Sequence, residues 1–375
     1  MSESLGKRWR FTKRRQVPLM LTPEASDVSD AATARTCSRT EASDAPQLAV
    51  VITCFNYEAY VERAIRSVLD QNCDACELLV VDDGSTDGSW ETITRYAVTA
   101  FKIQNRGQLG ACLFGLEKTQ ARFILFLDAD DELKPGSLAR ILAELDERVA
   151  KLQFGLTLID AESRPVGSFS SLESFRERDR LVNEVLRRGV YKTPPTSGNV
   201  FRRDVCELLR EVDYDKAVDG VVLFVAPFLG DVVSLSEELG NYRVHGLNDS
   251  QLGQLPSASL LQRDIERFVA RTEHLRAILA RVAPGRRLVE PQGAFYYRER
   301  SFCLQIVSAS SSRASMLPKL IASVGSEPFP IVQKIALVTF FVLAAMLPHE
   351  PARALMAYRS RNRRRSGRLR FASRR

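Results

Sequence analysis

A parallel β-sheet is indicated most clearly by one short stretch of the chain, Leu78-Leu79-Val80-Val81-Asp82-Asp83-Gly84-Ser85. Four consecutive apolar residues are typical of a strand buried on both faces, and the acidic and small residues after them are typical of a turn. Two runs of the same character flank it, Leu48-Ala49-Val50-Val51-Ile52 before it and Phe123-Ile124-Leu125-Phe126-Leu127 after it. We expect a weaker strand near Phe101.

Apolar residues at helical spacing fill the intervals between these strands. Val61, Ile65 and Val68 follow the first strand at such spacing, and further helices are expected through Trp90 and Tyr96 and over residues 107–118. Strands that alternate with helices predict an α/β domain with a mostly parallel sheet and right-handed crossovers.

Polar or acidic residues follow three of the predicted strands. They are Thr53-Cys54-Phe55-Asn56-Tyr57, Asp82-Asp83-Gly84-Ser85 and Asp128-Ala129-Asp130-Asp131. The carboxyl ends of parallel strands meet at one edge of a sheet, where such folds bind ligands. Carboxylates that converge there repel each other unless a cation lies between them, and oxygen ligands suit a hard divalent cation. Each motif alone is equally typical of a turn or a helix cap, but the three together favour a metal site.

The charge of the chain is concentrated at its two ends. The net charge is +7; residues 1–20 contribute +5, and the ten arginines after Glu350, with no acid among them, contribute +10. The residues between therefore carry −8, which excludes a nucleic-acid-binding body. Basic ends of this kind contact anionic lipid or stay solvated.

The cysteines indicate a reducing compartment. There are seven, an odd number, scattered from Cys37 to Cys303 without a dense framework. Cys73 and Cys76 form a CxxC pair, but a zinc site needs four ligands and no second pair is nearby. We interpret them as two ordinary thiols. The first twenty residues lack an apolar core after their basic start, so we expect a cytoplasmic protein.

At this point the motifs resemble those of the family-two glycosyltransferases, which share the nucleotide-diphosphosugar-binding fold called GT-A. Residues 51–56 resemble the family's first strand and nucleoside-contacting loop, residues 79–87 its second signature, and residues 128–130 its DxD element. The resemblance implies a nucleotide site formed by Thr53, Phe55, Asn56, Asp82, Asp83 and Asp128. In it, Asp83 accepts the N3 proton of uracil or thymine, Phe55 lies against the base, and Asp128 lies near the ribose and sugar. Asp130 is implied as a metal ligand, with Asp131 as an accessory one.

The resemblance continues through the second half of the domain. Residues 196–203 resemble the segment that borders the acceptor, which implies acceptor-side roles for Thr196, Ser197, Gly198 and Asn199. Asp219 stands where the family carries its catalytic acid, although an aspartate here also suits a helix cap. Residues 242–250 match the motif that closes the domain, and His245 in it is either a metal-side ligand or a structural histidine.

One stretch departs from the family pattern. Many relatives carry Ala-Arg-Asn after the segment that corresponds to Asn105-Arg106-Gly107, whereas this chain has Ala111-Cys112-Leu113. The missing arginine puts one contact to the diphosphate or sugar in doubt, and Arg106 or Gln108 is a candidate to replace it.

The predicted activity is therefore an inverting sugar transfer. A UDP- or dTDP-sugar is the favoured donor, a hydroxyl of a saccharide or lipid-linked molecule the acceptor, Asp219 the base, and Mg²⁺ or Mn²⁺ the cofactor. Two alternatives are a catalytically inactive nucleotide-sugar-binding or scaffold protein and a sugar nucleotidyltransferase. The second lacks the glycine-rich, basic triphosphate loop. The motifs specify neither the donor sugar nor the acceptor, the linkage or the oligomeric state.

The expected organisation has five parts. Residues 1–46 form an unstructured basic and polar leader, residues 47–250 the GT-A domain, and residues 251–329 a helical extension. Residues 330–350 are apolar, and residues 351–375 are an Arg-rich tail. Within the apolar part, residues 335–347 have no charge but are too few to span a membrane. They predict either a core helix or an interfacial helix, and the second reading, with the basic tail, predicts peripheral contact with an anionic cytoplasmic leaflet.

Overall fold

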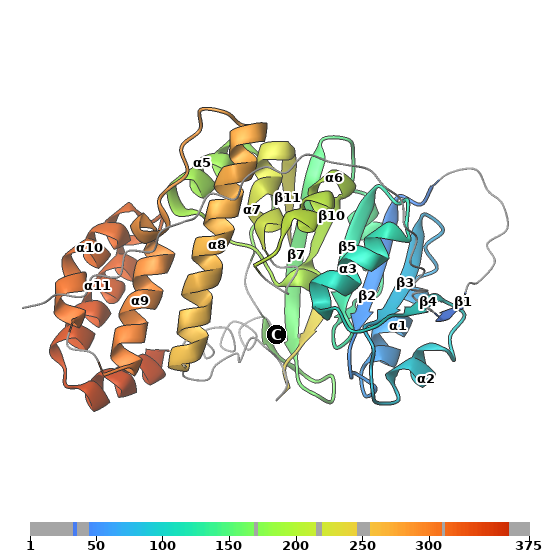
Figure 1. Cartoon of the computed structure of the whole chain (residues 1–375), viewed down its shortest axis with the longest axis horizontal. Coiled ribbons are helices and arrows are strands. Elements are labelled where there is room, and N and C mark those ends of the chain that lie inside the picture. Colours follow the sequence, from blue (N-terminus) through green and yellow to red (C-terminus); the bar gives the residue numbers. More distant parts are fainter. Residues whose placement is uncertain are drawn as a thin grey trace, which may run out of the picture. The chain divides into compact units, whose positions relative to one another are not determined.

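The structure is a computed structural model that describes residues 33–35 (backbone only), 45–168, 172–214, 220–245, 256–309 and 312–359. One mixed sheet organises the first three quarters of this part (Figure 1). Its strands lie in the order β1 (Thr33–Arg35), β4 (Thr99–Lys102), β3 (Cys76–Asp82), β2 (Leu48–Cys54), β5 (Phe123–Asp128), β10 (Asn199–Arg202), β7 (Val149–Ile159), β11 (Asp231–Arg243) and β6 (Glu132–Leu133). Two more strands pair beside this path, β8 (Pro165–Ser168) with β7 and β9 (Phe175–Glu177) with β11.

Most of the central strands run in one direction. β4, β3, β2 and β5 pair in parallel, β10 is antiparallel to β5 and β7, and β7 and β11 are again parallel to each other. The carboxyl ends of β2, β3 and β5 therefore meet at one edge, as the sequence predicts. The prediction of an α/β fold with a mostly parallel sheet and a helical C-terminal region is confirmed.

Helices cover both faces of the sheet because side chains alternate along each strand. Ala49 and Val51 of β2 point to one face, whereas Val50 and Ile52 point to the other. The first face is covered by α3 (Gly107–Glu117), α5 (Asp179–Arg188), α6 (Arg203–Glu207) and α7 (Val221–Leu229). The second is covered by α1 (Val61–Leu69), α2 (Ser89–Ile93) and α4 (Ser137–Leu142).

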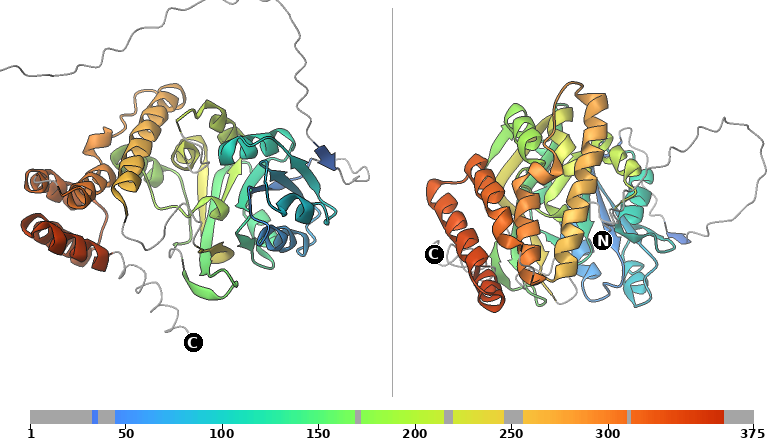
Figure 2. Two further views of the ribbon diagram at one scale, coloured as in Figure 1. Left: turned by 60° about the horizontal axis from the view of Figure 1, so that its bottom comes forward. Right: turned by 60° about the vertical axis from the view of Figure 1, so that its left-hand side comes forward.

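The C-terminal helices are α8 (Ala258–Val282), α9 (Phe295–Val307), α10 (Arg313–Ser326) and α11 (Ile331–Met346). α8 contacts α7 along one side and α9 along another (Figures 1 and 2). Leu275, Ile278 and Leu279 of α8 belong to the core under the sheet, whereas Leu261 near its start belongs to a separate core formed with α9, α10 and α11. Three short 3₁₀ turns complete the described elements: η1 (Thr196–Gly198), η2 (Leu208–Glu211) and η3 (Pro291–Gly293).

Three details differ from the sequence predictions. The helix expected through Trp90 and Tyr96 ends at Ile93. Thr33–Arg35 of the predicted unstructured leader pair with β4, because an edge strand offers unpaired backbone groups. Cys73 and Cys76 form a disulfide rather than remaining two thiols, since the turn between α1 and β3 brings their Cα atoms within 5.3 Å, a distance that suits the bond.

The other predictions for the two ends of the chain concern residues outside the described part. These are the rest of the leader, residues 1–32 and 36–44, and the tail from residue 360. Within the described residues, no helix combines the length and the apolar character needed to cross a membrane.

Candidate active site

A pocket of about 830 Å³ opens at the carboxyl edge of the sheet. One side of it is formed by the loops after β2, β3 and β5 and by the start of α3. These strand ends and loops, together with the connection from β4 to α3, contribute the lining residues Thr53, Phe55, Tyr57, Asp83, Asn105, Gln108, Asp128 and Asp130. The strand ends that the sequence singles out therefore come together around one cavity, of a size that suits a small-molecule ligand.

Three carboxylates after β5 form the acidic centre of the site. One oxygen from each of Asp128, Asp130 and Asp131 lies within 4.8 Å of the other two. Burial, followed by the nearby carboxylates of Asp130 and Asp128, raises the pKa of Asp131 well above its usual value. Oδ2 of Asp131 is buried without a hydrogen-bond partner among the described residues. This all-oxygen set fits a hard divalent cation, which would relieve the repulsion and satisfy the buried oxygen.

A buried arginine fixes the backbone of this acidic turn. Arg243, the last residue of β11, is fully buried, and its Nε donates to the carbonyl oxygen of Asp130 at 2.9 Å. Its backbone N–H donates to Oδ1 of Asp131 at 2.9 Å, and its guanidinium also pairs with Glu132. The positions of the carboxylates therefore depend on β11, far along the chain.

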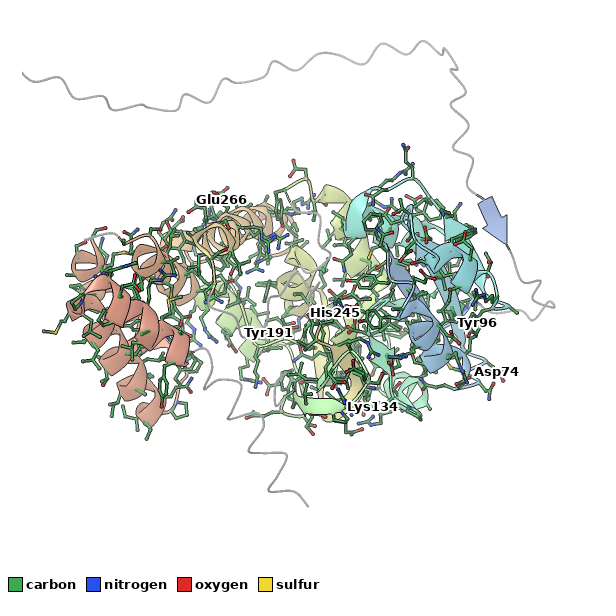
Figure 3. All side chains as sticks on the ribbon, turned by 90° about the horizontal axis from the view of Figure 1, so that it is seen from below. Asp74, Tyr96, Lys134, Tyr191, His245 and Glu266 are labelled. Carbon is green, nitrogen blue, oxygen red and sulfur yellow. A yellow bond between two sulfur atoms is a disulfide. The ribbon has the colours of Figure 1, made fainter. Side chains whose placement is uncertain are left out.

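His245 follows the end of β11 and can be found by its label in Figure 3. Its Nε2 lies 2.9 Å from Oδ2 of Asp130, and its side chain is only 6% exposed. The imidazole stacks on the ring of Tyr60, with 5.2 Å between the ring centroids. The structure thus places His245 against a candidate metal ligand, outside the three-carboxylate group itself.

Asp83 lies at the end of the pocket that is predicted to hold the nucleoside. It is buried, lines the cavity, and accepts a hydrogen bond from the backbone N–H of Arg106 at 2.7 Å. Burial raises the pKa of Asp83, and the backbone donors of Arg106 and Gly107 oppose that shift. Phe55 lines the same end with 44% of its surface exposed, which leaves an open ring face for a ligand.

Two predicted site residues shape the loops instead of lining the pocket. Asp82 is fully buried, and its Oδ1 accepts from the backbone N–H groups of Gly84 and Ser85. Gly84 has a φ of 79°, which glycine adopts without strain, so the chain turns sharply after β3. Asn56, with a φ of 58°, accepts from the backbone N–H of Thr86 through its side chain at 2.8 Å. The bonds to Asp82 shape the loop after β3, and the bond from Thr86 to Asn56 joins this loop to the one after β2.

Gln108 is one of the two residues proposed above to replace the missing arginine, and it takes part in the site. Its Nε2 donates to Oδ1 of Asp128 at 2.6 Å, and its side chain lines the pocket. Arg106 contributes its backbone N–H to Asp83, as described above. The sequence names both residues as candidates, and the structure places both next to predicted ligand-binding carboxylates.

The segment predicted to border the acceptor, residues 196–199, contributes one lining residue and three supporting ones. Thr196 lines the pocket together with Thr193, Pro194 and Pro195. Ser197 accepts from the backbone N–H of Asp128 at 3.2 Å, so the segment is joined to the acidic turn. Gly198 has no room for a side chain beside Pro194, and buried Asn199 donates to the carbonyl oxygens of Pro194 and Pro195.

Asp219 lies outside the described residues, so its role as base stays a prediction. The next residue, Gly220, lines the pocket, as do Leu223 and Phe224 of α7.

The sequence reasoning missed the far wall of the pocket. α8 contributes Asp264, Arg267, Phe268 and Arg271, and α9 contributes Tyr296. The four α8 residues share the spacing i, i+3, i+4 and i+7 of a single helix face, which is the signal available in the sequence. That spacing says nothing about which partner the face meets.

Comparison with known proteins identifies the class. Residues 49–207 match glycosyl transferase family 2. An uncharacterized glycosyltransferase of Nostoc sp. is 30% identical over 267 residues, which cover 68% of this chain and 83% of that protein. A putative teichuronic acid biosynthesis glycosyltransferase of Bacillus subtilis is 32% identical over 149 residues, or 38% of this chain and 59% of that protein. Among solved structures, residues 1–349 of S. aureus TarS with UDP-GlcNAc align with a TM-score of 0.48 at 17% identity, over 86% of this chain and 92% of that one.

The family match and these relatives, together with the carboxylate-edged pocket, define the chain as a glycosyltransferase. It belongs to glycosyl transferase family 2, and the resemblance inferred from its motifs is confirmed.

Proposed function

We propose that this enzyme transfers a sugar from a nucleoside-diphosphate sugar, with UDP- or dTDP-sugars favoured, to a hydroxyl of a saccharide or lipid-linked acceptor with inversion. The observation that carries the proposal is the shared pocket of Asp83, Asp128 and Asp130. In this proposal Asp83 accepts the N3–H of a pyrimidine at one end, and the three-carboxylate group holds a cation and the diphosphate at the other.

The chemistry that we propose is a single displacement. The carboxylate of Asp219 takes the proton of the acceptor hydroxyl, and the hydroxyl oxygen forms a bond to the anomeric carbon. The bond from that carbon to the diphosphate oxygen breaks at the same time, and the oxygen leaves with the electron pair. Mg²⁺ or Mn²⁺, held by Asp130 with Asp128 and Asp131, would neutralise charge on the departing diphosphate. The role of the carboxylates is to position the donor so that the opposite face stays open to the acceptor.

A donor panel tests this proposal. We expect release of nucleoside diphosphate from one of the UDP-, dTDP- and GDP-sugars, with Mn²⁺ or Mg²⁺ and not with chelator. Asp219→Asn should slow that release by about 100-fold or more while the donor still binds, because general base catalysis contributes on this order. Asp213→Asn, the same change at an exposed aspartate nearby, is the matched control and should stay active.

Three other results of the donor panel are possible. Full activity in Asp219→Asn would remove this residue as the base. Donor binding without any release, even with membrane extract as acceptor, would favour a binding or scaffold protein. If no donor binds and no nucleoside diphosphate is released, the proposed function is contradicted.

We also propose peripheral contact with an anionic membrane surface on the cytoplasmic side, as suits an enzyme of cell-envelope polysaccharide synthesis. α11 exposes an apolar stripe that its packing on α10 leaves uncovered. The stripe consists of Val332, 75% exposed, Ile335, 59% exposed, Leu343, 45% exposed, and Met346, 79% exposed. The ten arginines after Glu350 lie next to this stripe in the sequence. Apolar surface beside a run of basic residues is the combination that binds anionic lipid.

Sedimentation with vesicles tests the membrane contact. Ile335→Ser combined with Met346→Ser should weaken binding to phosphatidylglycerol vesicles by at least about tenfold, since two exposed apolar side chains can no longer insert. Leu69→Ser combined with Val282→Ser changes two apolar residues that are exposed elsewhere and is the matched control. If both double variants sediment equally with the vesicles, the membrane proposal is contradicted, and the stripe would instead contact another partner.

A further inference from the structure

The far wall of the pocket has a composition that the sugar-transfer chemistry does not use. Asp264, Arg267, Phe268 and Arg271 of α8 all line the cavity, opposite the acidic edge of the sheet. They share one helix face because residues three and four apart are neighbours on a helix. Phe224 of α7 and Tyr296 of α9 extend this wall on its two sides.

Aromatic rings hold one of the two arginines in place. The guanidinium carbon of Arg271 lies 4.5 Å from the ring centroid of Phe224 and 5.5 Å from that of Phe268. Phe268 in turn packs on Tyr296, with 4.9 Å between the ring centroids. A guanidinium held over rings keeps its N–H groups in a fixed plane, the geometry that recognises phosphate or carboxylate in a bidentate manner.

Among the described lining residues of α8, two arginines accompany one acid. This acid is Asp264, whose Oδ2 lies 3.4 Å from Nε of Arg300. Arg267 and Arg271 line the pocket beside this acid. The opposite edge carries Asp83, Asp128 and Asp130, so the two sides of the cavity differ in sign.

α8 is held in place by packing at both of its ends. Its second half packs into the core under the sheet, and its first half packs into the core of the C-terminal helices. The cavity, at about 830 Å³, lies toward the large end of ligand pockets and offers room for a second molecule beside the donor.

We infer that Arg267 and Arg271 form an anion subsite that binds a phosphate, diphosphate or carboxylate carried by the acceptor. This inference rests on the proposed function, because the donor's diphosphate belongs at the three-carboxylate group on the other side. The subsite selects an acceptor whose hydroxyl stands close to a negative group. It contributes to acceptor binding rather than to donor binding.

Calorimetry on the full chain tests the subsite. The protein is first loaded with Mn²⁺ and the nucleoside diphosphate that binds it, and four probes are then titrated: D-glucose 1-phosphate, farnesyl phosphate, D-glucuronate and neutral methyl glucoside. At least one anionic probe should bind about tenfold or more tightly than methyl glucoside, since hydrogen bonds from arginine to an anion are charge-assisted. The strongest probe distinguishes a sugar phosphate, a lipid phosphate and a carboxylate as the source of the charge.

Variants assign the effect to the two arginines. Arg267→Gln combined with Arg271→Gln should weaken the anionic probe by about tenfold or more and leave the affinity for nucleoside diphosphate unchanged. Arg271→Lys retains the charge but loses the planar fork between the rings, so its affinity for the anionic probe should lie between those of the unchanged protein and the double glutamine variant. Arg281→Gln, on the same helix but paired with Glu211 at the surface, is the matched control.

The outcomes separate this inference from the proposed function. If no nucleoside diphosphate binds with Mn²⁺, both fail. If it binds but no anionic probe exceeds methyl glucoside, or if the double glutamine variant binds the anion as well as the unchanged protein, the subsite alone is overturned.

Discussion

Replacing Asp130 with alanine is expected to lower metal-dependent release of nucleoside diphosphate by about 1,000-fold or more. Asp130 lies at the centre of the three-carboxylate group and also contacts His245. A cation at such a site contributes several kcal/mol of charge stabilisation to the transition state, and each 1.36 kcal/mol corresponds to about tenfold in rate. Release is measured with the donor chosen by the panel, at saturating Mn²⁺.

Thermal unfolding shows whether the loss is one of metal binding. Mn²⁺ should raise the melting temperature of the unchanged protein and should not raise that of Asp130→Ala, because only a ligand that binds the folded state stabilises it. Asp70→Ala removes an exposed carboxylate at the end of α1 and should behave as the unchanged protein. Retained turnover in Asp130→Ala would show that the acidic turn does not hold the catalytic cation.

The sheet and its acidic edge were predictable because their signals are local. β2, β3 and β5 are continuous apolar runs that nothing but a buried strand explains well, and their polar ends must meet once the strands are parallel. The short length of α2 was not predictable from Trp90 and Tyr96, whose apolar spacing continues past the residue where the helix ends.

Buried charged residues were not predictable, because their partners are distant in the sequence. Lys151 is fully buried in β7, where its Nζ donates to the side-chain oxygens of Gln153, Tyr191 and Thr193. These partners lie up to 42 residues away, so a sequence pattern presents this lysine as a solvated one. The α8 wall is similar, because the face of a helix that meets a pocket is set by packing against other elements and not by the helix itself.

The site residues also differ in how far their roles follow from local sequence. Asp83 and Asp128 line the pocket as their motifs imply, and these placements follow from the positions of the strands. Asp82 lies in the same motif as Asp83, and Ser197 and Asn199 lie in the segment 196–203, but all three form hydrogen bonds within the protein. A motif marks a region that must keep one shape, and the sequence alone does not separate the residues that touch a ligand from those that hold the loop.

Replacing Arg243 with methionine is expected to lower the free energy of unfolding by about 3–5 kcal/mol, the usual cost of removing one partner of a buried charged pair. The apolar stem of the side chain remains, but Glu132 loses its cationic partner, and the carbonyl oxygens of Asp130 and Asp160 lose theirs. Urea unfolding, with the midpoint and slope measured for each variant, gives the difference. The free energy of unfolding of Arg243→Lys should lie between those of the unchanged protein and Arg243→Met, since lysine keeps the charge but not the planar fork.

A matched control lies on the loop after β7, which Arg243 contacts through Asp160 and Ser163. Arg164→Met removes a 71% exposed arginine that pairs with Asp160 and Glu162, and such surface pairs contribute about 0–1 kcal/mol. If Arg243 acts on the site through the turn of Asp130, Arg243→Lys should also weaken the affinity for Mn²⁺, whereas Arg164→Met should not. A loss of stability below about 1 kcal/mol in Arg243→Met would mean that the acidic turn keeps its shape without this residue. The metal site would then be formed by residues 128–131 alone, and β11 would contribute only its strand pairing to the fold.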